Sequence, residues 1–179
     1  MDPPIVRRAT VEDAEVLGSI GPAAYAEAYG HLWDRSDAYS DQLRTFGVRA
    51  FEALLARPEA HLWIGEVQGI VVGFLSMIVG SVDPVERRLG GAEIPRIYVI
   101  EPAQRAGLGR LLLDAAIEQA TTEGVSHVWL DVMASATAAR RAYAKWGFRE
   151  IGGRRFQKPV KVGQSDMVVL LKEVKQSAG

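Results

Sequence analysis

Residues 104–109 read Gln-Arg-Ala-Gly-Leu-Gly and separate a strand-like run over 93–100 from an amphipathic helical pattern over 107–123. The first turn of a helix presents backbone N–H groups without partners in the helix, together with the positive end of the helix dipole. Two glycines there would let a phosphate approach the backbone closely, and Arg105 and Arg110 would add positive charge. The segment therefore predicts a pyrophosphate-binding turn, although the same glycines would also serve tight packing alone.

Other chemistries lack their motifs in this chain. A Rossmann fingerprint would need a glycine where Leu112 stands, and a Walker A loop would need Gly-Lys-Ser/Thr, which is missing. The three histidines are far apart and lack metal-ligand spacing, and there is no G-x-S-x-G nucleophile elbow. We therefore expect neither a metal site nor a serine hydrolase.

The pattern around this turn predicts an α/β fold. Strands are expected over 5–9, 61–67, 70–79, 93–100, 127–133, 148–152 and 167–172, and helices over 16–29, 36–45, 48–56, 107–123 and 135–146. Gln68-Gly69 predicts a tight hairpin turn. Gly18, Gly21 and Pro22 predict an interruption or kink in the first helix. Alternating strands and helices in the second half imply at least one parallel crossover.

Composition predicts one domain over 1–179. The 179 residues are 48% hydrophobic and 24% charged, which suits a single buried core, and the absence of cysteine excludes disulfides and a thiol nucleophile. No apolar run is long enough to span a bilayer and the amino terminus lacks a signal-peptide pattern, so we expect a cytoplasmic protein that does not bind membranes.

The net charge of −1 hides a division along the chain. Residues 1–94 carry 8 basic and 14 acidic side chains, a balance of −6, whereas residues 95–179 carry 13 basic and 8 acidic, a balance of +5. Without an overall basic surplus, a nucleic-acid partner is not expected. The division would suit one anionic and one cationic partner, unless it is chance scatter over solvated surface.

Two motifs make the chain resemble the GNAT superfamily of N-acetyltransferases. Gln104, Gly107 and Gly109 match Q/R-x-x-G-x-G/A, and Ala139, Tyr143, Gly147 and Phe148 match A-x-x-x-Y-x-x-x-G-F. The resemblance implies a mixed, mostly antiparallel sheet of six to seven strands, flanked by helices, whose fourth and fifth strands splay apart. It also implies that the backbone of residues 104–110, with Ala106 and Leu108 included, binds the pyrophosphate of acetyl-coenzyme A (acetyl-CoA).

The resemblance suggests three catalytic residues. Tyr143 would be the acid that protonates the departing thiolate. Glu93, which opens the fourth strand, stands where several amine-acetylating members place a general base, whereas Asp131 stands where other members carry an acidic proton acceptor. A base is needed because at pH 7 only about one alkyl amine in a thousand is uncharged. Glu93 could instead be a solvated residue paired with Arg96, so the choice between the two carboxylates stays open.

Further cofactor contacts follow from the same resemblance. Pro95 cannot donate to a ladder, so the fourth strand should lose pairing there and leave the backbone of Ile97, Tyr98 and Val99 to the pantetheine arm. The family often has an Asn where this chain has Ala136, so that contact is missing or supplied by another group. Arg140 could reach the 3′-phosphate or could simply coat its helix.

The function that these expectations support is acetyl transfer from acetyl-CoA to a primary amine, directly within a ternary complex. The acceptor would be a small amine such as a polyamine, or a protein amino group, and the acidic first half favours a cationic one. Residues 20–50, the hairpin end and the 81–91 loop should form its pocket. The alternative is a non-catalytic acetyl-CoA sensor. A homodimer is conceivable, with exposed Leu32, Trp33 and Trp63 as interface candidates.

Overall fold

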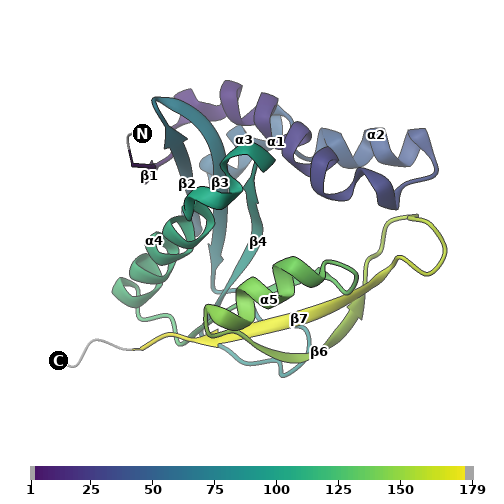
Figure 1. Cartoon of the computed structure of the whole chain (residues 1–179). Coiled ribbons are helices and arrows are strands. Elements are labelled where there is room, and N and C mark those ends of the chain that lie inside the picture. The colour runs from purple at the N-terminus through teal and green to yellow at the C-terminus, as the bar shows by residue number, and fades with distance from the viewer. Residues whose placement is uncertain (1–2, 176–179) are drawn as a thin grey trace.

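A seven-stranded sheet between two helical layers forms the computed structural model, which describes residues 3–175 (Figure 1). The strands are β1 (Ile5–Arg8), β2 (Ala60–Val67), β3 (Ile70–Val79), β4 (Gly91–Val99), β5 (His127–Met133), β6 (Arg149–Arg155) and β7 (Asp166–Glu173). The helices are α1 (Ala14–Tyr29), α2 (Ser36–Arg44), α3 (Val48–Leu55), α4 (Leu108–Thr122) and α5 (Thr137–Lys145). Short 3₁₀ turns lie at Val11–Asp13, Gly30–Leu32 and Glu101–Ala106.

The sheet is mixed and mostly antiparallel, as expected. Its spatial order is β1-β2-β3-β4-β5-β7-β6, and β4 and β5 form its one parallel pair in the described part of the chain, with α4 as the crossover. That pair joins Gly91–Glu93 to His127–Trp129 and then stops, whereas β5 pairs with β7 along its whole length. The two strands therefore separate just before Pro95, which confirms the predicted splay.

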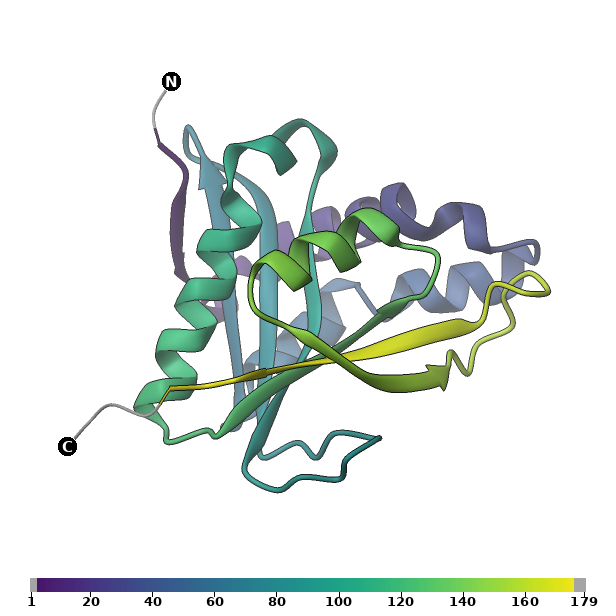
Figure 2. The same ribbon diagram turned by 60° about the horizontal axis from the view of Figure 1, so that its bottom comes forward.

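Each face of the sheet has its own helical layer and core. Buried leucines and alanines of α4, with Tyr143 of α5, pack on one face, and side chains of α1 and α3 such as Leu17 and Phe51 pack on the other. Figure 2 shows the green helices α4 and α5 in front of the sheet and the purple and blue N-terminal helices behind it. No helix among residues 3–175 is long and apolar enough to cross a membrane.

Two local features of the strands bear on the site. Gln68 and Gly69 both adopt positive φ (53° and 75°), which is the conformation of a two-residue hairpin turn, as predicted. The pairing of β3 with β4 contains a bulge. Ser76 of β3 pairs with Arg96 and Ile78 pairs with Glu93, so two residues of β4 oppose the single residue between Ser76 and Ile78. This β-bulge turns Glu93 to the same face as Arg96.

Several expectations about packing are wrong. Helix α1 continues through Gly18 and Pro22 without interruption. The glycines allow close packing instead, since a Cβ at Gly21 would lie 3.0 Å from the Phe51 ring. In α4, Leu111 is 41% exposed, whereas Leu113 is buried. The proposed interface residues are also buried, because they belong to the two cores: Leu32, Trp33 and Trp63.

Candidate active site

The predicted phosphate-binding turn forms the start of α4. Gly107 has φ +76°, a left-handed conformation that glycine adopts without strain, and it ends the 3₁₀ turn and begins the helix. Leu108 is fully buried and anchors the turn beneath β2 at Gly65. No described side chain caps α4. The amide of Arg110 donates to the Gly107 carbonyl at 3.1 Å, which leaves the amides of Leu108 and Gly109, at the first two positions of the helix, without an intrahelical acceptor. The turn therefore has the donors and the shape that a diphosphate requires.

The side chains of the turn mainly hold it in place. Gln104 donates from Nε2 to the carbonyl of Val99 at 2.9 Å, which ties the turn to the end of β4. Arg110 pairs with Asp114 at 2.8 Å, four residues along the same helix. The side chains of Arg105 and Ala106, both predicted to contact the cofactor, lie outside the described part of the chain. The backbone, more than Gln104 or Arg110, is thus left to meet a ligand.

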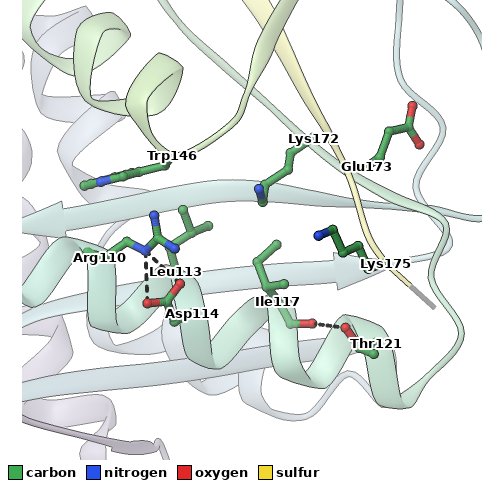
Figure 3. Close-up of a pocket in the computed structure, with 9 residues that line it drawn as sticks. All are labelled: Arg110, Leu113, Asp114, Ile117, Thr121, Trp146, Lys172, Glu173 and Lys175. Atoms are coloured by element: carbon green, nitrogen blue, oxygen red, sulfur yellow. Dashed lines mark hydrogen bonds and ion pairs between the residues drawn. The ribbon is translucent and has the colours of Figure 1, made fainter. Parts of the chain in front are cut away.

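A basic groove of about 240 Å³ continues from the turn along α4 (Figure 3). The Trp146 indole forms one wall of the groove. Its lining includes three cationic side chains, Arg110, Lys172 and Lys175, and two carboxylates, Asp114 and Glu173. Among the described residues, Lys172 has no carboxylate partner. The sequence alone does not predict this groove, because its residues come from α4 and from the ends of α5 and β7, which only the fold brings together.

An inner cavity of about 40 Å³ lies where β4 and β5 separate. Tyr143 from α5, Tyr29 from α1 and Tyr98 from β4 line it, together with Pro95 and Asp131. Tyr143 is 8% exposed, packs edge-on against Trp146 and Phe148, and has its pKa raised by burial. Its phenol therefore holds a proton at neutral pH and can donate it into this cavity.

An outer cavity of about 280 Å³ adjoins the inner one and shares Tyr29, Pro95, Tyr98 and Asp131 with it. Residues from the expected 20–50 segment line it: Tyr25, Tyr29, Gln42, Thr45 and Phe46. Neither the hairpin end nor the 81–91 loop does. The β6–β7 region supplies Arg154, Phe156 and Met167 instead. It reaches the cavity because β7 pairs with β5, and β6 pairs with β7.

Glu93 and Asp131, the two rival bases, meet in the outer cavity. Burial raises the pKa of Glu93, and the negative charge of Asp131 raises it further. Burial also raises the pKa of Asp131, against the opposing effect of Arg154, whose Nη2 lies 2.5 Å from Oδ2. Both carboxylates are thus better proton acceptors near neutral pH than ordinary ones.

Three other predicted contacts have different outcomes. The predicted pair between Glu93 and Arg96 is absent from the described ion pairs, since Arg96 donates to the carbonyl of Thr45 at 2.7 Å. Ala136 precedes α5, packs against both cores and offers no polar side-chain atom. Arg140 donates to the Ala134 carbonyl and to Glu150, so its guanidinium is engaged within the protein.

The remaining cofactor-contact residues lie along the free part of β4. Ile97 and Val99 pack on the core beneath α4, and Tyr98 packs on the opposite core, as strand alternation predicts. From Pro95 to Val99 the edge of β4 that faces β5 has no strand partner. That edge could pair with an extended ligand such as a pantetheine arm.

Comparison with known proteins agrees with this geometry. The model of the Acetyltransferase (GNAT) family matches residues 25–148. The chain belongs to this family. A structure of the PaiA N-acetyltransferase of Thermoplasma acidophilum in complex with coenzyme A has a TM-score of 0.75 at 16% identity, and covers 97% of this chain and 99% of that one. The shared fold confirms the expected GNAT architecture.

Two sequence relatives match this chain at higher identity than that structure does, over shorter stretches. The [ribosomal protein bS18]-alanine N-acetyltransferase of Salmonella typhimurium is 39% identical over 82 residues, which is 46% of this chain and 55% of that protein. This chain therefore matches about half the length of that relative. An uncharacterized N-acetyltransferase of Archaeoglobus fulgidus is 28% identical over 152 residues, 83% of this chain and 96% of that one.

Proposed function

We propose that this protein transfers the acetyl group of acetyl-CoA to a primary amine by direct attack within a ternary complex. One observation carries the proposal: the inner cavity connects Tyr143 to Asp131 through the gap between β4 and β5, and the outer cavity adjoins it on the acceptor side. A thioester and an amine entering from opposite sides would meet between an acid and a base.

The chain offers acetyl-CoA a continuous path. Amides of the turn at Gly107 and Gly109 would bind the pyrophosphate, and the free edge of β4 from Ile97 to Val99 would pair with the pantetheine arm. The basic groove beside Trp146 would accept the phosphorylated nucleotide end. Arg140 is engaged with Glu150, and Ala136 has no polar group, so the amides and the groove would provide most of the binding.

The reaction would proceed in three linked steps. Glu93 or Asp131 takes a proton from the ammonium group of the acceptor, which its raised pKa favours. The amine nitrogen then attacks the thioester carbon, so that a C–N bond forms and the C–S bond breaks. Tyr143 donates its phenolic proton to the departing thiolate, and the attacking nitrogen gives up its second proton, which restores the phenol and leaves a neutral amide.

The lining of the outer cavity supports a cationic acceptor. Its two carboxylates and five aromatic rings (Tyr25, Tyr29, Phe46, Tyr98 and Phe156) would suit an ammonium group, because aromatic faces attract cations. This is consistent with the cationic acceptor inferred from the acidic first half. One relative acts on the alanine of a ribosomal protein, which supports a protein amino group as one option and a small amine as the other.

The test measures coenzyme A release with a panel of amines, and acetyl-CoA binding by calorimetry. In the Tyr143→Phe variant, we expect acetyl-CoA to bind with little change while kcat falls about 10²-fold, because the general acid is removed. Arg49→Gln, an exposed change on α3, is the matched control. Tight acetyl-CoA binding by wild type without turnover of any amine would instead support a sensor.

A further inference from the structure

Arg96 is a partly buried cation without a counter-ion. Its guanidinium lies over the Phe46 ring at 4.2 Å and near the Phe51 ring at 5.7 Å, and Nη2 donates to the Thr45 carbonyl. No carboxylate among the described residues lies within ion-pair distance of it. A guanidinium has five N–H donors, and a buried charge without a partner is unfavourable. Arg96, which contacts two aromatic rings and lacks a carboxylate partner, therefore has donors to offer an anion.

A second donor lies beside it. Ser76 on β3 pairs directly with Arg96 in the sheet, is 0% exposed, and its Oγ has no hydrogen-bond partner among the described residues. Buried hydroxyls normally have a partner. Ser76 lines a side cavity of about 350 Å³, which shares Glu93, Pro95 and Arg96 with the outer cavity. Ser76 and Arg96 together thus provide hydroxyl and guanidinium donors for an anionic group.

The outer cavity contains one ion pair and two further charged residues of opposite sign that have no ion-pair partner among the described residues. Asp131 and Arg154 neutralise each other at 2.5 Å, which leaves Glu93 and Arg96 without protein partners of opposite charge at ion-pair distance. The β-bulge puts Glu93 and Arg96 on one face, opposite Ile78 and Ser76 of β3, at a spacing of about 7 Å along the strand. A ligand that satisfies both must carry a cation and an anion close together.

We propose, on the basis of the acetyl transfer described above, that the acceptor is a small amino acid-like molecule whose carboxylate binds Arg96 and Ser76. In an α-amino acid a single carbon separates the amine from the carboxylate, which suits an ammonium at Glu93 and a carboxylate at Arg96. A polyamine would bring a second cation against Arg96. A peptide amino terminus would offer only an uncharged carbonyl there. The surrounding Tyr25, Phe46 and Phe156 favour an apolar side chain.

The kinetic test compares apolar L-amino acids with the amines that lack only the carboxylate, such as phenylalanine with phenethylamine and leucine with isoamylamine. We expect wild type to prefer the amino acid by about 10²-fold or more in kcat/KM, since a charged site rejects a ligand that leaves it unpaired. In Arg96→Gln the ratio should fall to about one. Arg44→Gln, an exposed arginine on α2 that pairs with Asp41, is the matched control and should keep the wild-type ratio.

A binding test works without turnover. N-acetylphenylalanine, added with coenzyme A in a calorimeter, should bind wild type and lose at least tenfold in affinity in Arg96→Gln. If Arg96→Gln fails to fold, Ser76→Ala replaces it, and the amino acid preference should fall about fivefold in that variant.

The two proposals fail in different ways. Preference for a decarboxylated amine, a polyamine or a peptide amide overturns the carboxylate site and leaves acetyl transfer standing. Binding of N-acetylphenylalanine that depends on Arg96, without acetylation of any amine, supports the carboxylate site and overturns acetyl transfer. Equal binding by wild type and variant overturns the carboxylate site.

Discussion

Two regions of this protein bury carboxylates and use them differently. Asp83, in the loop before β4, is fully buried, and burial alone would raise its pKa. Four backbone amides, from Val85 to Arg88, donate to its two oxygens and lower the pKa instead. Glu93 and Asp131 in the outer cavity receive no backbone amide among the described hydrogen bonds, and burial raises their pKa values. Amide donors, more than depth, thus separate a buried carboxylate with a lowered pKa from one with a raised pKa.

The largest effect should come from neutralising the cavity pair. In Glu93→Gln/Asp131→Asn, we expect kcat/KM to fall about 10²- to 10⁴-fold, because proton acceptance is lost, without any loss of stability. Steady-state kinetics and urea unfolding measure the two quantities. The single variants identify the base, since one of them should account for most of the fall. A double variant that is unstable yet active would show that these carboxylates are structural.

Asp83→Asn should show the reverse. The amide that replaces a carboxylate oxygen cannot accept from backbone N–H groups, so we expect a loss of about 2 kcal/mol in unfolding free energy. Because Asp83 lies outside both cavities, kcat/KM should change less than about threefold. Urea unfolding and the amine assay check this. A large kinetic loss at unchanged stability would remove the distinction between the regions.

The pH dependence of stability should have opposite signs in the two regions. Asp83 has a folded pKa below its ordinary value of 3.8, so its stabilisation is present above pH 4 and is lost on acidification. Glu93 and Asp131 have folded pKa values above 4.5 and 3.8, so their contribution is lost as the pH rises through the folded values. Each pKa unit corresponds to about 1.4 kcal/mol. Urea unfolding from pH 2 to 7, with each variant subtracted from wild type, should show the Asp83 contribution rising with pH below about pH 4 and the contribution of the cavity pair falling with pH above it.

The smallest effect should come from Arg154→Gln. Its positive charge lowers the pKa of Asp131, so its removal should raise that pKa further. If Asp131 is the base, the acidic limb of the kcat/KM profile should move to higher pH, with a change of less than about tenfold at pH 8. Arg154 also lowers the pKa of Glu93, so the limb should move to higher pH with either base, and an unmoved limb would exclude both carboxylates. Arg155→Gln, the exposed neighbour on β6, is the control.

Local patterns predicted most of the fold. Alternation and helical spacing located every strand and helix of the described chain to within a few residues, and Pro95 predicted where β4 leaves β5. Errors arose where tertiary contacts override local pattern. Gly18 and Gly21 read as breakers but permit close packing, and Trp33 and Trp63 read as exposed although they complete the cores.

The site was only partly predictable. Two sequence motifs predicted the turn at Gly107 and singled out Tyr143, which lines the inner cavity, because both motifs depend on residues close in sequence. Arg154 and Phe156 could not be found that way, since β6 reaches the cavity only through its pairing with β7. The sequence offered Arg96 only as an ion-pair partner of Glu93, and the bulge that puts the two on one face was not predicted, because strand alternation puts residues three apart on opposite faces.

Because of the bulge at Ile94 and Pro95, the number of residues in β4 matters as much as their identity. Replacing Ile94 by valine would leave Glu93 facing the same way, whereas deleting either residue would close the bulge and reverse every side chain on one side of it. Selection should therefore eliminate single-codon deletions at these positions, although it would tolerate many point substitutions there. For the same reason, a sequence alignment that shifts its gap by one position would pair Glu93 with residues that face the opposite core.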